Sequence, residues 1–580
     1  MKNRICAALS AVQTAVILRQ STLDAKGFLF VFFAFFLAQS SAVSIYNIFI
    51  YPFYRSPLRH LPGPKDNTPV LGQSLSLLLA PSPNALYLKW MQQFPDAPLI
   101  RYLHFKNSEW LLVNSLQVVK DMLQTCCYDL EKPEWFHKIV GEIAGVGLVN
   151  AEGELHRKGR KGLGGSFSVS NVKKIFPVIN EKSQILSGII DDAVQKNPDE
   201  PIEVSSLMNH NAIDVMGVAA LGVELNSLAT SGSTFTHIYE TMFNQPPIGQ
   251  AIFFLNMFIP IRRFLPWVKA NTDYLHATTE VRRLLMQTIR ERKAEVFGKG
   301  KGEKGEGARK EFTEEGSRDF LTFMLYEKTV EGWSDEEIHG HLMNFMSAGH
   351  ETTAECISWG IQTLCLHPHI QDRLREEINR YIPHDGPPSY AELEKLKYMD
   401  NFLKEVLRCY SPSVLIPRSS STPIRLPSAP HTLIPPGTTL YISPSVLHFN
   451  PTIWGPDAHV FNPDRHGPDH PSAKLYPSSR DPFANLAFSV GPRICIGKRF
   501  AALEIKSVLV TVLRAWEVRR GWDADGNKLQ GGEEFVGHGN QREGARYEGP
   551  EGDLLAGIKV VNFLSLRPSK GIWVKFRKID

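Results

Sequence analysis

The sequence predicts a mainly α-helical fold that also contains small β-sheets. A capping-box pattern at Ser334–Glu337 starts an apolar-rich stretch that continues to about His367, which predicts a helix long enough to cross a whole domain. A second long helix is expected over 498–516. Segments 99–105 and 110–113 are short, rich in apolar residues and flanked by polar ones, so they predict a pair of strands.

The overall composition is that of an ordinary globular protein. Across 580 residues, 43% are apolar and 21% are charged, and the formal net charge of +4 is small for this length. A charge this small gives no indication of a nucleic-acid partner. The seven cysteines are an odd number without a C-x-x-C pair, which argues against a disulfide framework and favours a reducing compartment around the main domain.

An uncharged, apolar-rich stretch near the start predicts a single membrane-spanning helix. No charged residue occurs in 27–54, and a helix needs about 20 such residues to cross the hydrocarbon core. We expect an N-terminal extension over 1–26, a transmembrane anchor over 27–51, a proline-rich hinge over 52–66 and a main domain over 67–580. The alternative is a cleaved signal peptide, which the long preceding segment disfavours. Basic residues flank the stretch on both sides, so charge does not decide its orientation.

Several other segments have less specific signals. The apolar stretch 251–268 predicts either a core helix or a membrane contact. Residues 298–307 contain a G-x-G-x-x-G match, but no strand precedes it and its other residues are Lys and Glu, so we interpret it as a flexible insertion. Residues 521–557 are rich in glycine and charge and predict a surface loop. Segments 558–564 and 572–576 are expected to form a closing hairpin.

The most informative stretch, Phe488 to Gly497, holds one cysteine between two glycines. Glycines allow a tight turn and a close approach to a flat ligand, because they have no Cβ atom. Backbone N–H groups and the start of the following helix can favour the thiolate form of Cys495. Arg493, two residues earlier, can pair with a carboxylate. The alternative is a buried structural cysteine, which is the usual role of a cysteine without such flanking residues.

This stretch resembles the haem-binding signature of the cytochrome P450 family, F-x-x-G-x-R-x-C-x-G, at every fixed position. The resemblance implies the cytochrome P450 fold, with haem as the cofactor and Cys495 as its axial thiolate ligand to iron. It also implies that Phe488 lies against the haem and that Arg493 pairs with a haem propionate.

The middle of the long predicted helix reads Ala348-Gly349-His350-Glu351-Thr352-Thr353. Small residues let a ligand approach the helix, and a Thr hydroxyl can bond back to an earlier carbonyl. This stretch resembles the family's oxygen-activation motif, A/G-G-x-D/E-T-T, which implies that Glu351 and Thr352 are catalytic and relay protons. The alternative is the polar surface of an ordinary helix.

Further residues are assigned by the same resemblance. His156 and Arg160 lie one turn apart on a predicted helix and are similar to the pair that faces a haem propionate. The alternative is a solvated basic face, and the glycines that surround the pair put the length of this helix in doubt. Arg418 lies where family members often contact a propionate.

A structural triad is also expected from the resemblance. Glu405 and Arg408 match the family's E-x-x-R pattern, and Arg465 in the later segment Phe461–Arg465 completes the set. The three side chains would hold the loop that leads to Cys495. By itself, a pair with this spacing is usually a surface pair of little value.

Together, the motifs cover residues 61–576 and imply that the main domain, 67–580, is a haem-thiolate monooxygenase. The resemblance implies insertion of one oxygen atom from O₂ into a lipophilic small molecule. Electrons would come from NADPH through a separate NADPH-cytochrome reductase, because the chain shows no strand-linked dinucleotide motif. The hinge and the Glu-Thr-Thr stretch look like those of fungal microsomal members, often of secondary metabolism, which implies a single-pass protein of the endoplasmic reticulum with a cytosolic catalytic domain.

Alternatives to this function remain open. A haem-thiolate isomerase or dehydratase would rearrange a peroxide without O₂, and such enzymes commonly lose the Thr that is present here as Thr352. A fatty-acid or xenobiotic hydroxylase would differ in substrate only. A non-catalytic haem carrier or sensor is disfavoured because it would not need an acid–alcohol pair beside the iron.

Overall fold

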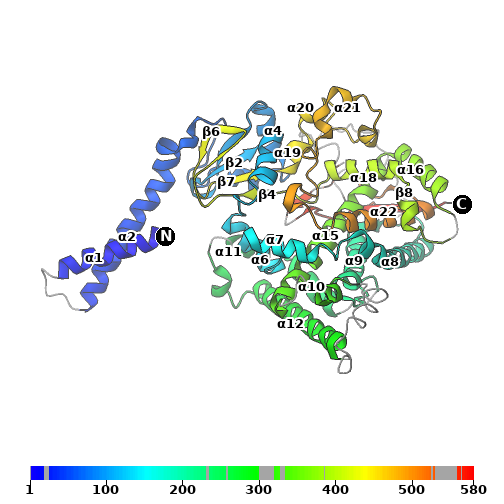
Figure 1. The fold of residues 1–580 in the computed structure, drawn as a ribbon, viewed down its shortest axis with the longest axis horizontal. Helices are drawn as coiled ribbons and strands as arrows, with labels where there is room; N and C mark the ends of the chain where they lie inside the picture. Colours follow the sequence, from blue (N-terminus) through cyan, green and yellow to red (C-terminus); the bar gives the residue numbers. More distant parts are fainter. Residues whose placement is uncertain are drawn as a thin grey trace.

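A single long helix, α15 (Asp335–Leu366), runs through the middle of the main body in the computed structural model (Figure 1). Ser334 caps it, with the Ser334 hydroxyl accepting from the Glu337 N–H and the Glu337 carboxylate accepting from the Ser334 N–H, so the predicted capping box is confirmed. The structure describes residues 2–18, 25–229, 234–256, 259–298, 319–326, 333–383, 386–523, 527–529, 555, 558, 560–562 and 565–579.

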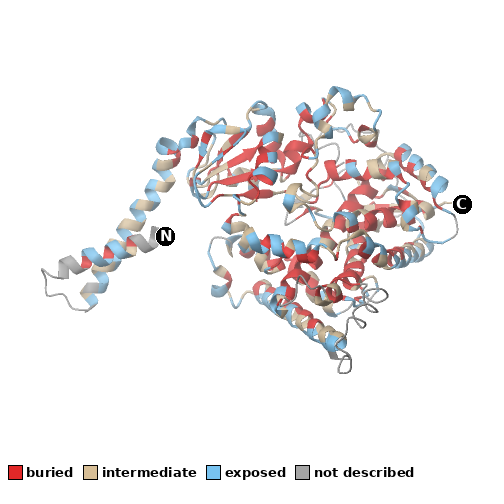
Figure 2. Cartoon of the chain, viewed as in Figure 1, coloured by how far each residue is buried: buried red, intermediate tan, exposed pale blue. Residues whose placement is uncertain are grey.

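Four long helices lie around α15. They are α8 (Val169–Lys196), α9 (Val204–Met216), α12 (Lys269–Gly298) and α22 (Lys498–Ala515). α9, α12 and α22 pack directly against α15, whereas α8 packs against α9 and α22. Most residues of α15 are buried, and Figure 2 shows this buried centre in red. The core therefore follows α15, which makes this helix the scaffold on which the rest of the main body is positioned.

Shorter helices complete the helical part of the fold. They are α3 (Ser74–Leu78), α4 (Ala85–Gln93), α5 (Leu116–Lys120), α6 (Glu134–Ala144), α7 (Gly153–Leu163), α10 (Thr234–Phe243), α11 (Pro247–Asn256), α14 (Phe320–Tyr326), α16 (Pro368–Tyr381), α17 (Tyr390–Leu393), α18 (Lys397–Cys409), α19 (Pro444–His448), α20 (Pro451–Trp454) and α21 (Ser472–Leu475). The helix around His156 forms over eleven residues despite its glycines, because Gly159 and Gly162 are buried against neighbouring elements. With the small sheets, this is the mainly helical fold that the sequence predicts.

The largest sheet lies at the edge of the main body nearest the N-terminal helices (Figure 1). The predicted strand pair forms β1 (Leu99–Leu103) and β2 (Glu109–Val113), which pair antiparallel. β2 then pairs parallel with β7 (Thr439–Ile442), and β7 pairs antiparallel with β4 (Ile416–Arg418). A separate pair, β5 (Ile424–Leu426) and β6 (Ala429–Ile434), lies beside it. The predicted strand pair is therefore confirmed, and β7 connects it with β4 in the same sheet.

The predicted closing hairpin at the C-terminal end is wrong. β9 (Val560–Asn562) pairs with β10 (Leu566–Pro568), a segment that was not expected to form a strand. β11 (Trp573–Lys578) instead pairs with β8 (Trp516–Arg520) and with β3 (Ile202–Glu203). Val574 and Phe576 of β11 are buried in the main core, so burial of this strand's apolar face outweighs pairing with its neighbour in sequence.

The N-terminal helices extend away from the main body (Figure 1). α1 (Lys2–Leu18) packs against α2 (Ala25–Ile45), which continues without a break as η1 (Tyr46–Arg55). Residues 29–55 form one helix that is long and apolar enough to cross a membrane. The helix passes the end predicted at residue 51, because the ring of Pro52 is tolerated in a π-helical turn. The hinge is non-helical after His60, and the Pro62 carbonyl accepts from the Arg101 N–H of β1.

The predicted insertions lie largely outside the described residues. Of 298–307, only Gly298 is described, and 530–554 is not described at all. In the stretch 251–268, Phe254 on α11, Phe264 on η6 (Ile261–Phe264) and Trp267 in the turn after η6 have exposed apolar side chains.

Candidate active site

The loop that carries Cys495 is shaped by its backbone. Gly491 has a φ of 73°, and a Cβ atom there would collide with the Leu123 carbonyl oxygen, so only glycine fits. A short 3₁₀ turn, Gly491–Arg493, follows, and the Cys495 N–H donates to the Phe488 carbonyl at 2.8 Å. Helix α22 starts three residues after Cys495. The loop thus closes on itself and presents the sulfur at the start of a helix.

Opposing effects act on the Cys495 thiol. The residue is exposed, but the chain around its sulfur removes part of the surrounding water, and this desolvation raises the pKa of the thiol above its ordinary value. The backbone N–H groups of Gly497 and Lys498 and the guanidinium of Arg160 favour the thiolate. A metal ion bound to the sulfur would complete the deprotonation.

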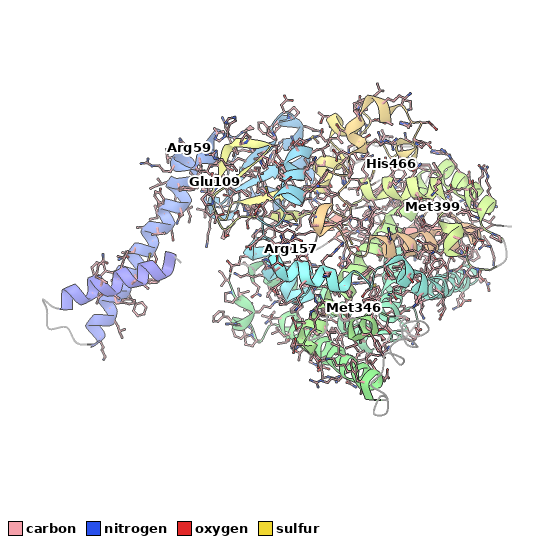
Figure 3. All side chains as sticks on the ribbon, viewed as in Figure 1. Arg59, Glu109, Arg157, Met346, Met399 and His466 are labelled. Carbon is pink, nitrogen blue, oxygen red and sulfur yellow. The ribbon has the colours of Figure 1, made fainter. Side chains whose placement is uncertain are left out.

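The middle of α15 presents an alcohol on its accessible side. Ala348 is exposed and Thr352 is half-buried, whereas His350 and Thr353 beside them are buried. The Thr352 hydroxyl donates to the Ala348 carbonyl at 2.6 Å, one turn earlier. Figure 3 labels Met346, which lies on α15 just before this stretch. The small residue and the hydroxyl leave room for a ligand against this part of the helix.

Phe167 connects α15 with the Cys495 loop. Its ring lies 5.1 Å, centroid to centroid, from that of Phe345 on α15, and 3.8 Å from where a Gly497 Cβ atom would be. The predicted oxygen-activation stretch and the predicted sulfur ligand are therefore held near one another by an aromatic contact.

Glu351 is turned toward the C-terminal strands. It is buried, with 3% of its surface exposed, and its Oε1 lies 2.5 Å from the Nε atom of Arg567. The Ser565 hydroxyl donates to the same carboxylate oxygen. The acid predicted beside Thr352 therefore forms an ion pair with β10, a partner 216 residues away in the chain.

Basic side chains gather between α7, β4 and the Cys495 loop. Lys132 Nζ lies 2.8 Å from the Glu152 carboxylate, and Arg493 pairs with the same carboxylate. Arg493 also donates to the Ala151 carbonyl at 2.9 Å. Arg418 is buried, and its Nε atom has no hydrogen-bond partner among the described residues. We call Lys132, Arg418 and Arg493 the basic cluster.

The basic cluster has more positive charge than the protein neutralises. Burial and the charge of Arg493 lower the pKa of Lys132 to about 8 and that of Arg418 to about 10. Glu152 is the acidic group that faces them within the described residues. Buried cations without enough counter-charge are costly, so this cluster is suited to an anion. The two propionates of a haem supply such charge, and the residues present therefore fit this cofactor.

His156 and Arg160 of α7 lie next to the basic cluster in different ways. The His156 ring hydrogen-bonds to the Tyr128 hydroxyl at 3.2 Å, and burial, with Arg493 and Lys132 nearby, lowers its pKa to about 4. The Arg160 Nη1 atom donates to the Ile494 carbonyl at 2.6 Å, beside Cys495. Arg157, which follows His156 and is labelled in Figure 3, is exposed instead. The neutral His156 can bind an anion only by donating an N–H.

Sequence reasoning missed Lys132, Tyr128 and Glu152. None of them belongs to a motif, and they precede Cys495 by more than 340 residues. Their only sequence signal is the position of Glu152 just before the helix that carries His156.

Phe488, which the signature contains, is half-buried, and its ring lies 5.8 Å from Lys498 Nζ.

The residues of the predicted triad come together. Arg408 Nη2 lies 2.7 Å from Glu405 Oε1, and Arg465 Nε lies 3.5 Å from the same oxygen. His466, labelled in Figure 3, lies 2.9 Å from the other Glu405 oxygen. The side chains of Glu405, Arg408 and Arg465 have no solvent exposure. Arg408 compensates the buried charge and keeps the pKa of Glu405 far below its usual range despite burial.

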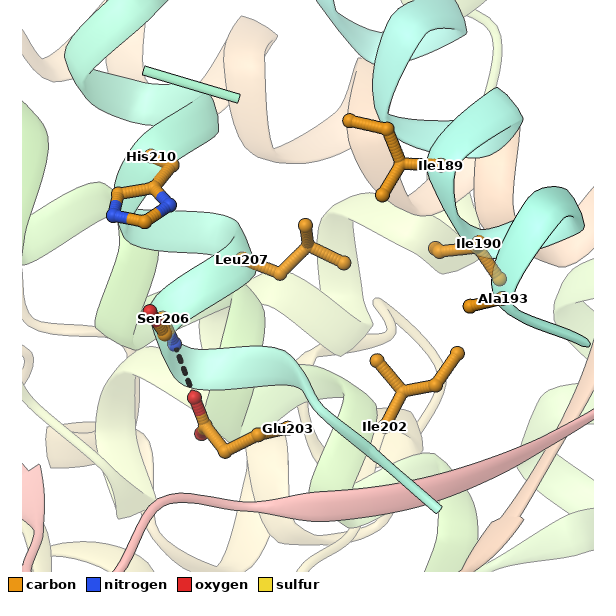
Figure 4. A pocket seen from close by; sticks show the side chains of 8 residues that line it. All are labelled: Ile189, Ile190, Ala193, Ile202, Glu203, Ser206, Leu207 and His210. Atoms are coloured by element: carbon orange, nitrogen blue, oxygen red, sulfur yellow. Dashed lines mark hydrogen bonds between the residues drawn. The ribbon is translucent and has the colours of Figure 1, made fainter. Parts of the chain in front are cut away.

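A surface pocket of about 340 Å³ lies apart from these groups. It is formed by α8, β3 and α9, and Figure 4 shows the hydrogen bond that Glu203 accepts from the Ser206 N–H within it. Its lining residues are Ile189, Ile190, Ala193, Ile202, Glu203, Ser206, Leu207 and His210. Glu203 caps α9 and His210 pairs with Glu240, so the polar groups of this pocket already have structural roles.

The site combines the cysteine loop, a helix that carries an acid and an alcohol, and the basic cluster. This combination defines a haem-thiolate protein. The family model for cytochrome P450 matches residues 62–532. The chain therefore belongs to the cytochrome P450 family, and it is an oxidoreductase of the monooxygenase class.

Several fungal proteins are similar to it. Cytochrome P450 monooxygenase sphH of Aspergillus fumigatus is 31% identical over 81% of this chain and 84% of its own length. Cytochrome P450 monooxygenase FUM15 of Gibberella moniliformis is 28% identical over 82% and 85%. Cytochrome P450 monooxygenase ALT8 of Alternaria alternata is 24% identical over 92% and 91%.

Proposed function

We propose that the protein binds haem through Cys495 and inserts one oxygen atom from O₂ into a lipophilic small molecule. Electrons come from NADPH through a separate reductase, and the substrate belongs to secondary metabolism. The support for the general reaction is the family membership, and the support for the metabolic role is the likeness to fungal relatives. The protein is anchored in the endoplasmic reticulum membrane, with its catalytic domain in the cytosol.

The observation that carries this proposal is the exposed thiol of Cys495, with backbone N–H groups directed at its sulfur and a basic cluster nearby. Arg493 and Arg418, together with Lys132, hold the propionates, and His156 and Arg160 of α7 support that side of the cofactor. Phe488 lies against the porphyrin. When bound, the haem supplies the reductive activation of O₂.

The residues on α15 control protons. The Thr352 hydroxyl is accessible and donates to the Ala348 carbonyl, so it can accept a hydrogen bond from a water molecule, and it can donate toward the reacting oxygen once it releases that carbonyl. Glu351, buried beside it in sequence, supplies protons to that hydroxyl. The role of Thr352 rests on its position at the accessible part of α15, and that of Glu351 rests on its place next to Thr352 in the sequence.

The alternative function is that of a haem-thiolate isomerase or dehydratase. Such an enzyme needs no proton relay from a Thr hydroxyl, and the presence of Thr352 therefore favours the monooxygenase. A fatty-acid or xenobiotic hydroxylase uses the same site, so only the substrate separates it from the proposed role.

The test begins with Cys495→Ala. Reduced wild-type protein exposed to carbon monoxide should show the absorption band typical of thiolate-ligated haem, and the variant should lose it. Cys365→Ala removes another free cysteine and should keep the band. Wild-type turnover should require NADPH, reductase and O₂ together. A Cys495→Ala variant that retained the band would overturn the ligand assignment, and turnover of a hydroperoxide without NADPH would favour the isomerase.

The apolar surface formed by α11, η6 and the turn after η6 is part of the same proposal. Phe254, Phe264 and Trp267 are exposed there, and exposed apolar patches commonly contact membranes. We propose that this surface touches the bilayer beside the anchor.

A further inference from the structure

A second acidic residue lies on α15, one turn after Glu351. Residues four apart share a helix face, so Glu351 and Glu355 are neighbours on this helix. Both are buried, with exposures of 3% for Glu351 and 8% for Glu355. The signature used to assign Glu351 does not extend to Glu355.

The Glu351 carboxylate is already committed to donors. Arg567 donates from Nε to Oε1 at 2.5 Å, and the Ser565 hydroxyl donates to the same atom. Arg567 also donates from Nη1 to the Asn244 amide oxygen at 3.3 Å. The indole N–H of Trp359 donates to the Leu566 carbonyl at 3.0 Å and fixes this strand against α15. An ion-paired carboxylate has no proton to give, so a proton that Glu351 passes on must first come from another group.

Glu355 is in the opposite situation. Its Oε2 atom has no hydrogen-bond partner among the described residues, although the side chain is more than nine-tenths buried. Three charged groups face it, namely Glu351 on the same helix, Arg567 on β10 and Glu203 on β3. One cation thus serves three carboxyl groups, and it is already paired with Glu351.

Glu355 therefore holds a proton. An ionised carboxylate without a partner is too costly to bury, so such a group becomes neutral instead. Burial raises the pKa of Glu355 to about 8, with Arg567 opposing this effect and Glu351 and Glu203 adding to it. The pair on α15 consequently consists of one ionised acid and one neutral acid.

We propose that Glu355 is a proton store for the relay on α15. In each transfer, an O–H bond of the Glu355 carboxyl breaks and an O–H bond forms on the Glu351 carboxylate. The O–H bond on Glu351 then breaks as its proton moves toward the Thr352 hydroxyl, and a proton from bulk solvent, relayed through water beside the partly exposed Arg567 side chain, returns to the Glu355 carboxylate. Glu355 is a positioning residue in this role, because it acts through Glu351. The inference rests on the proposed function of Glu351 and Thr352.

The protonation state is tested first, on the haem-loaded enzyme by infrared difference spectroscopy. One carboxylic acid C=O band should be present at pH 6, should fade as the pH rises through about 8, should be missing in Glu355→Gln and should remain in Glu504→Gln. Glu504→Gln serves as the matched control, because Glu504 is also buried with both carboxyl oxygens unpartnered among the described residues, but lies on α22. A Glu355 that is ionised at pH 6 would overturn the proposal.

Turnover then tests the role. Glu355→Gln keeps the shape of the side chain but has no transferable proton, so O₂ consumption should fall about 10-fold and its solvent hydrogen isotope effect should increase. Glu355→Asp should restore most of the rate, and Glu504→Gln should leave the isotope effect unchanged. An unchanged isotope effect in Glu355→Gln would show that the acid is only structural.

The variant Glu351→Gln distinguishes a failure of the proton store at Glu355 from a failure of the relay through Glu351 and Thr352. If this variant slows O₂ consumption and Glu355→Gln does not, only the proton store is wrong. If neither variant changes O₂ consumption or its isotope effect, the relay in the proposed function fails as well. Retention of the carbon monoxide band in every variant shows that haem binding is intact.

Discussion

Arg408 donates from Nε and Nη2 to the two carboxylate oxygens of Glu405, at 2.8 and 2.7 Å, with no solvent access to either side chain. Arg408 also donates to the His448 carbonyl at 2.7 Å, and the His448 ring accepts from the Leu486 N–H at 2.9 Å. Leu486 lies two residues before Phe488. The buried pair on α18 is thereby connected to the start of the Cys495 loop.

This connection predicts that Arg408→Ala destabilises the protein strongly. The change removes the two short hydrogen bonds to the buried Glu405 carboxylate and leaves it the longer contact with Arg465 and the contact with the His466 ring, and breaking a buried pair costs ~3–5 kcal/mol. Arg373→Ala breaks a half-exposed pair with Asp464 at 2.8 Å and should cost about 1 kcal/mol or less. Denaturant unfolding of both variants checks the difference. Equal losses of unfolding free energy in the two variants would show that burial does not make the Glu405 pair more important for stability than an exposed pair.

A second prediction concerns Lys132, which no motif contains. If the basic cluster holds the haem propionates, Lys132→Gln removes a charged hydrogen bond worth about 1.5–3 kcal/mol. Haem should then dissociate roughly 10–100 times faster, a factor that follows from this energy. The measurement is the rate of haem transfer to an excess of a haem-scavenging protein. Lys138→Gln removes an exposed lysine on α6 and should leave the rate unchanged.

Thr352→Ala should separate O₂ consumption from product formation. Without the hydroxyl, protons are no longer steered, so NADPH is still consumed but more hydrogen peroxide and less product appear. The ratio of product to NADPH consumed measures this effect, and we expect it to fall by about 10-fold or more, within reach of positioned proton transfer. Thr363→Ala is the matched control, because Thr363 makes the same bond to a carbonyl one turn earlier, at 2.8 Å. An equal ratio in Thr352→Ala and wild type would reject the relay.

The raised pKa of Glu355 predicts a pH dependence of stability. The folded state holds this proton up to a pH of about 8, whereas the unfolded state releases it near 4.5. Folding therefore binds a proton between these values, and the contribution of Glu355 to the free energy of unfolding falls as the pH rises across this window, by at most ~1.4 kcal/mol per pH unit. Glu355→Gln should flatten the stability curve between pH 5 and 8, measured by denaturant unfolding. Parallel curves for variant and wild type would contradict the assignment.

Removal of residues 1–60 tests the anchor. The truncated chain should shift from the membrane toward the soluble fraction and should keep its haem spectrum, because the catalytic domain begins after this segment. Membrane association that persists should disappear when Trp267→Asp is added, since Trp267 is exposed on the proposed second contact. Loss of haem on truncation would show that the segment supports the fold instead.

Much of the site could be predicted because its patterns are local. The turn around Gly491, the capping box of Ser334 and the one-turn spacing of Glu405 and Arg408 depend on residues close together in the chain. Backbone sterics and hydrogen bonds within a few residues determine such features. The strand pair β1 and β2 belongs with them, because a short connection leaves few other registers.

The partners of these groups depend on packing between distant segments. Nothing near Glu351 in sequence indicates its ion pair with Arg567, and nothing near Arg493 indicates Lys132 or Glu152. The wrong hairpin has the same origin, because the buried face of β11 selects β8 rather than its neighbour in sequence. By itself, the sequence determined which groups we propose to carry the chemistry, namely Cys495, Thr352 and Glu351. Only the tertiary structure decided which partners surround them, since contacts such as that of Glu351 with Arg567 form between segments that are distant in the chain.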